Sequence, residues 1–121
     1  MKLSMMSYTM ACRPDLFDIR EMLELARDLE MDGIDFVTTH KTEPSELRRM
    51  ADDHGMPVVC YTFYADLREP GWWRRRKQIR RARRGIETAV ALGAPLIMIP
   101  PLPDPSEDRD AARRQWIKGF G

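Results

Sequence analysis

Polar and aromatic side chains follow three apolar runs of the sequence, where parallel strands would end. Tyr8 comes late in the first run, His40 follows the second, and Tyr64 and Asp66 follow the third. Hydroxyl groups, an imidazole and aromatic rings suit a sugar-like ligand, which offers many hydrogen-bonding groups and an apolar face. We therefore take Tyr8, His40, Tyr64 and Asp66 as candidate substrate-binding residues. The alternative is that these strand ends simply meet solvent.

His40 stands where a general base, a metal ligand or a hydrogen-bond donor to a substrate can act. The alternative is an exposed loop histidine beside Lys41. Asp66 is the carboxylate in the best position for chemistry, although a turn-forming role before Leu67 is the interpretation that we favour. Asp35 falls near the start of its strand, which is the end that stabilises such folds, so we do not predict a catalytic role for it.

The elements that would position these residues alternate between strand and helix. The predicted strands run from Leu3 to about Met10, from Ile34 to Thr39, from Pro57 to Phe63 and from Leu96 to Ile99. The predicted helices start at a cap on Asp18, at Pro44, at about Trp72 and at Asp110. We expect Gly33 to end the first helix with a positive φ. In the long helix from Trp72 to Leu92, a stripe of apolar residues should face the core: Ile79, Ala82, Ile86, Ala89 and Val90.

Four strand–helix units predict an α/β fold with a parallel sheet. A closed (β/α)8 barrel needs roughly 200 residues or more. The chain has 121 residues, so we predict a single domain over 1–121 that forms the first four units, a half-barrel. A complete small open sheet is the alternative. In either architecture a ligand would lie beyond the carboxyl ends of the strands.

The composition is that of a globular protein without a dominant charge. Lys and Arg number 20 and Asp and Glu number 19, giving a net charge of +1. This balance disfavours nucleic acid as a partner. No apolar run approaches the roughly 20 residues of a membrane span, and the N-terminus lacks a signal peptide's apolar region. The two cysteines are expected to be free thiols in a reducing, cytoplasmic location.

Eight cationic residues crowd the segment WWRRRKQIRRARRG, which begins at Trp72. Three interpretations are open. The helix could present an outer face whose arginines pair with Glu107, Asp108 and Asp110, it could recognise phosphate, or it could bind nucleic acid with Trp72 and Trp73 as stacking surfaces. We favour the outer face, because a lone basic helix on a neutral chain is weak evidence for nucleic acid.

Several segments together resemble the sugar phosphate isomerase/epimerase family of the xylose isomerase-like TIM barrels. They are KLSMMSYT, LFDIREMLELARDLEMDG, GIDFVTT, ELRRMADDHGMPVVCYTFYADL and RRGIETAVALGAPLIMIP. The likeness covers the first half of the family's barrel. It implies aldose–ketose isomerisation or epimerisation (EC 5) of a sugar or sugar phosphate, assisted in many members by a divalent metal such as Mn, Mg, Co or Zn. It also implies that Tyr8, His40, Tyr64 and Asp66 form a substrate rim.

The resemblance has limits that shape the expected function. The family's metal ligands and catalytic carboxylates come from later strands, so none is assigned here and the isolated chain is expected to be inactive. Many relatives carry an acidic residue where this chain has Thr38. The DNA-repair endonuclease branch tends to place a histidine where this chain has Tyr61 and Thr62, which favours the isomerase branch. The alternative is a non-catalytic half-barrel that binds small sugars or phosphorylated ligands and forms a homodimer through its exposed edge strands.

Overall fold

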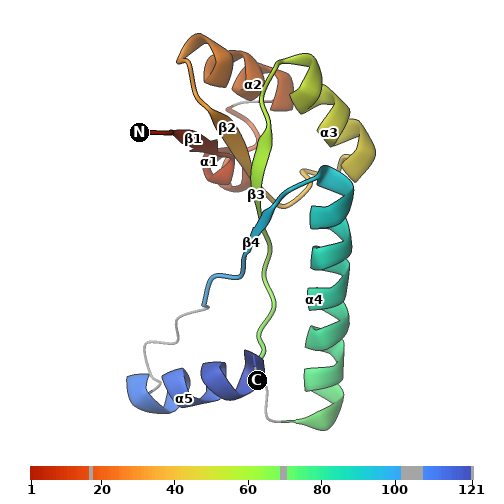
Figure 1. Ribbon diagram of the computed structural model, residues 1–121. Coiled ribbons are helices and arrows are strands. Elements are labelled where there is room, and N and C mark those ends of the chain that lie inside the picture. The colour runs from red at the N-terminus through yellow and green to blue at the C-terminus, as the bar shows by residue number, and fades with distance from the viewer. Residues whose placement is uncertain (17, 69–70, 102–107, 121) are drawn as a thin grey trace.

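Four parallel strands alternate with helices along the chain (Figure 1). The computed structural model describes residues 1–16, 18–68, 71–101 and 108–120. The elements are β1 Ser4–Met6, α1 Tyr8–Cys12, α2 Ile19–Asp28, β2 Gly33–Val37, α3 Pro44–Asp53, β3 Val58–Thr62, α4 Trp72–Leu92, β4 Leu96–Met98 and α5 Arg109–Phe120. The strands lie in the order β1-β2-β3-β4 in one parallel sheet. The predicted repeat of strand and helix is confirmed, and the open sheet is consistent with half of a barrel.

The core lies between the central strands and the helices that follow them. Ile34 and Phe36 of β2 are buried together with Leu23 of α2, Leu47 of α3 and Leu92 of α4. Side chains alternate between the two faces of a strand, so the residues between these apolar positions point to the other face of the sheet. Full burial of such side chains contributes roughly 1.5–3 kcal/mol each, which makes this contact the main source of stability.

Helix ends follow the sequence signals in most places. The side chain of Asp18 accepts the backbone N–H of Glu21, and the Glu21 side chain accepts the N–H of Asp18, which forms a capping box at the start of α2. Pro44 occupies the first turn of α3. Gly93 ends α4 in the left-handed region, with φ of 70°. Each arrangement satisfies backbone groups or fixes a torsion angle that the helix end needs.

Gly33 is not the left-handed helix end that we predicted. The positive φ near the end of α2 belongs to Glu30, at 53°. Gly33 is instead the first residue of β2, where an added Cβ would lie 2.5 Å from Cγ1 of Val59 and 2.8 Å from the carbonyl oxygen of Pro57. The register between β2 and β3 shifts at this point. A glycine therefore lets the two strands approach closely beside the irregularity.

The first strand is shorter than predicted, because it ends at Met6 and residues 8–12 form the helix α1. The backbone N–H of Ser7 donates to the carbonyl of Asp35, and the Ser7 hydroxyl accepts the N–H of Val37. A side chain thus takes the hydrogen bond that a further strand residue would have made. The chain turns away at this point, and Tyr8 is placed on a helix and not on a strand.

The long helix α4 has the predicted bounds but a different buried face. Gly85, Ala89 and Leu92 are buried, whereas Ile79, Ile86 and Val90 of the predicted stripe are exposed. An added Cβ at Gly85 would lie 2.5 Å from ring atoms of Phe63. Small residues therefore let α4 approach the chain after β3 closely, and the larger aliphatic residues are left on a free side.

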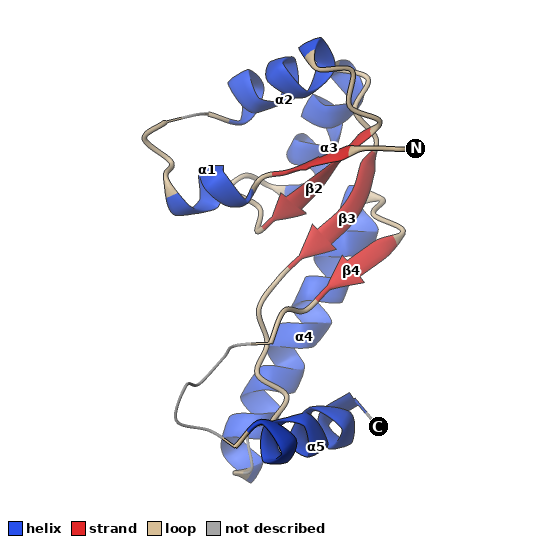
Figure 2. Ribbon diagram, turned by 90° about the vertical axis from the view of Figure 1, so that its left-hand side faces the viewer, coloured by secondary structure: helices blue, strands red, loops and turns tan. Residues whose placement is uncertain are grey.

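Helix α5 lies beyond the carboxyl ends of β3 and β4 (Figure 2). Trp116 of α5 packs against the core, and the Arg68 guanidinium lies 5.9 Å from its ring centre. Phe120 stacks on Trp116 with 5.4 Å between ring centres. These contacts attach α5 to the segment that follows β3.

Candidate functional site

A hydrogen bond joins the carboxyl ends of the first two strands. The hydroxyl oxygen of Ser7 lies 2.8 Å from Nε2 of His40, although the two residues are 33 positions apart. The same oxygen accepts the backbone N–H of Val37 at 2.8 Å. Ser7 is almost fully buried, at 1% exposure. The imidazole of His40 is therefore held by a group that is itself fixed to the sheet.

The partners of Ser7 indicate which nitrogen of His40 carries the proton. A buried hydroxyl needs an acceptor for its own proton. Nε2 of His40 is the acceptor that the described residues offer it, so Ser7 donates to Nε2 and the proton of the neutral ring resides on Nδ1. Burial lowers the pKa of His40, which favours this neutral form. No described residue hydrogen-bonds Nδ1, so this N–H is available to a ligand.

The loop that carries His40 has an unusual backbone. Thr38, His40 and Lys41 have φ angles of 67°, 50° and 63°. Each such residue costs roughly 1–3 kcal/mol, and a β-branched threonine in this region is a genuine outlier. Backbone strain of this kind concentrates at functional sites, so the segment from Thr38 to Lys41 is the strongest candidate for a functional loop among the described residues.

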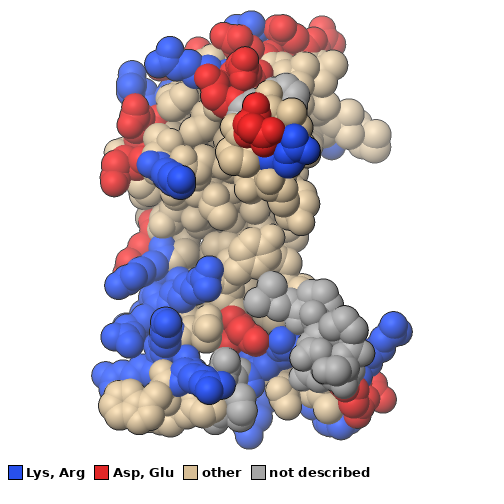
Figure 3. Space-filling model, turned by 180° about the vertical axis from the view of Figure 1, so that it is seen from behind, with Lys and Arg blue, Asp and Glu red and all other residues tan. Residues whose placement is uncertain are grey.

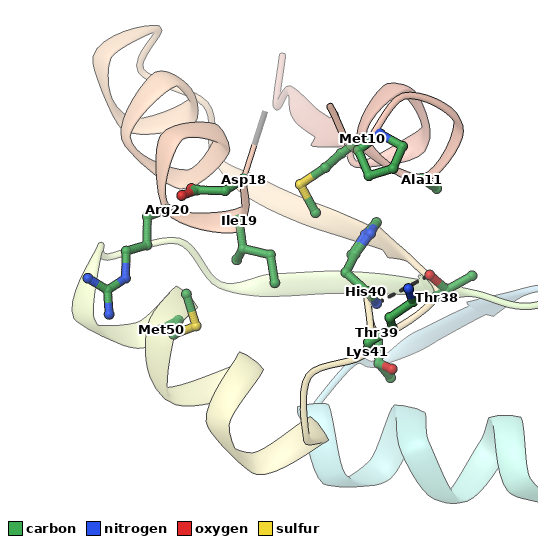
Figure 4. Close-up of a pocket in the computed structure, with 11 residues that line it drawn as sticks. Met10, Ala11, Asp18, Ile19, Arg20, Thr38, Thr39, His40, Lys41 and Met50 are labelled. Carbon is green, nitrogen blue, oxygen red and sulfur yellow. Dashed lines mark hydrogen bonds between the residues drawn. The ribbon is translucent and has the colours of Figure 1, made fainter. Parts of the chain in front are cut away.

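A cavity of about 670 Å³ opens beside this loop (Figure 4). The ring of His40 lies on one side of it, and Ile19 of α2 and Met50 of α3 lie on the other. Arg20 and Lys41 add cationic groups to the lining. Asp18 adds a carboxylate to the same lining. The cavity therefore combines apolar walls with an imidazole, two cationic groups and one acidic group, a combination that suits a polar ligand.

Tyr8 and Tyr64 are brought near each other by the fold. A hydrogen bond with the thiol of Cys12 is the main cause that raises the pKa of Tyr8, and the charge of Tyr64 raises that pKa further. Tyr8 is 52% exposed, and Tyr64 is partly buried. Two phenol groups thus stand near each other, one following β1 and one following β3, and Tyr8 is the residue after Ser7.

Asp66 is held by Arg68. The two side chains form an ion pair at 3.0 Å, and the Asp66 carboxylate also accepts the backbone N–H of Arg68 at 3.1 Å. Arg68 lowers the pKa of Asp66, which keeps the carboxylate ionised. The turn-forming role that we kept as an alternative for Asp66 is therefore present, whereas a ligand-binding role stays a prediction.

Asp35 is a buried carboxylate for which we predicted no catalytic role. It is 6% exposed and accepts the hydroxyl of Thr62 at 3.2 Å. Burial raises the pKa of Asp35, and its charge contributes to a raised pKa of Cys60. The sequence signal for this buried carboxylate is its place within an otherwise apolar strand, between Ile34 and Phe36. It lies on the face of the sheet away from the helices.

The described residues do not gather a metal site. No three His, Cys, Asp or Glu side chains within the described ranges are close enough to share an ion. His40, Asp35 and Asp66 each bond to a different partner: Ser7, Thr62 and Arg68. The described residues therefore do not form a binding site for the divalent ion that the resemblance implied. No metal-dependent step is assigned to them.

The acidic partners that we favoured for the basic helix are only partly within the described residues, so this pairing stays a prediction. None of the ion pairs between described residues involves Arg75, Arg80 or Arg83. Asp108 accepts the backbone N–H of Asp110, and Glu107 lies outside the described residues. The space-filling view shows Lys and Arg gathered along α4 (Figure 3).

Comparison with known proteins assigns the fold to a family. The family described as xylose isomerase-like TIM barrel matches residues 23–121. The chain belongs to this family. No curated protein matches the chain. None of its helices, within the described residues, combines the length and the apolar character needed to cross a bilayer.

Solved structures agree with the family assignment. A protein of Sinorhizobium meliloti 1021 superposes with a TM-score of 0.72 at 22% identity, covering 98% of this chain and 43% of that one. The probable 3-DHS dehydratase AsbF of Bacillus anthracis gives a TM-score of 0.73 at 14% identity, covering 99% and 46%. The 3-keto-D-glucoside 4-epimerase of E. coli gives 0.62 at 17%, covering 87% and 46%. At these identities the likeness establishes the fold, and the chain spans less than half the length of each of these proteins.

Proposed function

We propose that this chain is the N-terminal, substrate-binding part of a sugar or sugar phosphate isomerase or epimerase. The proposal rests on the Ser7–His40 pair, which lies at the carboxyl ends of β1 and β2 beside a strained loop and a cavity. Ligands of barrel enzymes bind at this end of the strands. Membership of the xylose isomerase-like family and the fold shared with a keto-glucoside epimerase support a carbohydrate ligand.

Each candidate residue has a role that its surroundings allow. Nδ1–H of His40 donates to a sugar hydroxyl or carbonyl oxygen, and the phenols of Tyr8 and Tyr64 exchange hydrogen bonds with hydroxyl groups while their rings cover an apolar sugar face. Ionised Asp66 accepts a hydrogen bond from a sugar hydroxyl through lone pairs that Arg68 leaves open. Arg20 and Lys41, which line the cavity with His40, suit the phosphate of a sugar phosphate.

Proton transfer is not assigned to this chain. Isomerisation and epimerisation require a base at the carbon next to a carbonyl, and the described residues neither pair two carboxylates nor gather metal ligands. The metal-assisted step therefore falls to groups beyond those described. We expect the isolated chain to bind sugars without converting them. The free thiols of Cys12 and Cys60 support a reducing, cytoplasmic location.

The test is calorimetric titration of the purified chain with D-fructose and with a D-fructose phosphate. We expect weak binding, and we expect the His40→Ala variant to lose about tenfold in affinity, the equivalent of roughly one hydrogen bond. His54→Ala is the matched control, because the His54 ring contacts the backbone carbonyl of Met50 on α3. This variant should leave the affinity for sugar unchanged. Absence of binding to either sugar, or equal affinities of the His40 and His54 variants, would refute the proposal.

A further inference from the structure

The sheet has two unpaired edges. β1 pairs only with β2, and β4 pairs only with β3, within the described residues. An unpaired strand presents a row of backbone N–H and C=O groups that another strand can bind. Parallel sheets are normally buried within the protein. Here, large apolar side chains on and beside both edge strands are exposed. These edges therefore carry exposed apolar side chains to which sugar binding assigns no role.

One edge is formed by β4 and the free side of α4. Ile79, Ile86 and Val90 follow each other at intervals of seven and four residues, which places them on one side of the helix. Ile86 is 46% exposed and Val90 is 72% exposed. Leu96 and Ile97 of β4, which follows α4 in the sequence, are also exposed. We call Ile79, Ile86, Val90, Leu96 and Ile97 the α4 edge. Arg76 and Arg83 flank its helical row.

The opposite edge is formed by β1 and α2. A groove of about 170 Å³ lies between them, and its lining includes Met5, Met6, Met22 and Leu25. We call these four residues and exposed Leu29 the β1 edge. Glu21 precedes Leu25 by four residues and Asp28 follows it by three, so helical spacing places acidic groups on the same side. Asp28 also pairs with Arg27 at 3.1 Å, and Glu21 accepts the N–H of Asp18. The β1 edge is therefore an apolar groove flanked by two carboxylates that already have partners within the chain.

We propose that the α4 edge of one molecule docks on the β1 edge of a second copy of this chain. The apolar row of α4 is complementary to the apolar groove of the β1 edge, and arginines meet acidic groups around it. The same polarity extends over the chain: residues 1–66 hold seven Lys and Arg against thirteen Asp and Glu, and residues 67–121 hold thirteen against six. In Figure 3 basic groups gather along α4, whereas acidic groups lie among basic ones at the end that holds α2 and α3.

Two copies suffice to close the arrangement. Pairing β4 of one molecule with β1 of its partner, twice, joins four parallel strands to four more, which is the strand number of a closed barrel. The two junctions are identical and related by a two-fold axis, so no edge stays open. Further strands of a longer barrel, which the proposed function implies, would also cover the edges. The match in charge between the two edges of this chain is the reason to propose a second copy.

The test measures the mass of the purified chain by light scattering over a range of concentrations. We expect a dimer of twice the 14.1 kDa chain mass. Ile86→Asp in the α4 edge and Leu25→Lys in the β1 edge should each raise the dimer dissociation constant by about 100-fold or more, because each buries an unpaired charge at the junction. Ala91→Asp is the matched control, since it adds the same charge at an exposed position on another side of α4.

Mixing the two variants gives the sharper result. Ile86→Asp keeps an intact β1 edge, and Leu25→Lys keeps an intact α4 edge. A mixed dimer therefore has one junction between two unchanged edges, whereas a dimer of either variant alone has none. We expect the mixture to form a heterodimer and each variant alone to stay monomeric. Circular dichroism verifies that both variants are folded. The proposal is refuted by a monomeric parent chain at all concentrations, by a variant that still dimerises alone through like edges, or by open-ended oligomers that grow beyond the dimer.

Discussion

At the scale of single residues, the account depends on His40 and its partner. The sequence singled out His40 because it follows an apolar strand, and the structure places it at that strand's carboxyl end. The role of Ser7 could not be predicted, because its hydrogen bond to a residue 33 positions away depends on how β1 and β2 pair. Tyr8 was assigned to a strand end, but the capping of β2 by Ser7 turns the chain into a helix there.

The lowered pKa of His40 makes stability depend on pH. Burial favours the neutral ring in the folded state, whereas the unfolded chain titrates near pH 6.5. The unfolded state therefore binds more protons just below this value, and the contribution of His40 is present above pH 6.5 and lost as the pH falls through the window toward the lower folded pKa. We expect the free energy of unfolding, measured in urea, to fall on acidification below about pH 6.5.

The variant His40→Gln isolates this effect, because glutamine does not titrate. The difference in unfolding free energy between the parent and this variant should change between neutral and mildly acidic pH, and other titrating groups cancel in that difference. A difference that is constant across this range would show that His40 is not buried in its neutral form.

At the scale of elements, local chemistry predicted the helices well and the strand ends less well. Asp18, Pro44 and Gly93 mark helix ends that need no tertiary information. The close approach at Gly33 depends on Val59 of another strand, so the sequence could not distinguish it from a helix end. The free side of α4 was mistaken for part of its buried face, because Ile79 and Ile86 fit the same periodicity as the alanines beside them.

The packing of α4 on Phe63 gives a prediction at this scale. Gly85→Ala should lower the free energy of unfolding by about 1 kcal/mol or more, because overpacking a rigid buried ring costs roughly 1–3 kcal/mol and exceeds the helix-propensity gain of about 1 kcal/mol. Gly71→Ser, at the start of the same helix, meets nothing within 4 Å and should not destabilise the chain. Thermal unfolding of both variants decides: an equally stable Gly85→Ala protein would mean that the helix does not contact Phe63 closely.

At the scale of the whole molecule, the order of the strand–helix units was predictable. The position of the last helix and the covering of the sheet edges were not. Four strand–helix units dictate parallel neighbours joined by crossovers, and the sheet order follows the sequence order. The position of α5 beyond β3 and β4 was not foreseen, because it depends on contacts of Trp116 and Gly119 with the segment around Leu67. The covering of the two edges by a second copy, which we propose, depends on association, and no local pattern encodes association.

The central claim is that ligands bind at the carboxyl ends of β1, β2 and β3. The most direct measurement is a nuclear magnetic resonance titration of the isotope-labelled chain with D-fructose, following backbone amides and the ring nitrogens of His40. We predict that the shifts concentrate at residues 7–8, 38–41 and 64–66 and that Nδ1 of His40 carries the proton before sugar is added. Shifts confined to the opposite ends of the strands, around Asp32 and Gly55, or a His40 ring protonated at Nε2, would contradict the account.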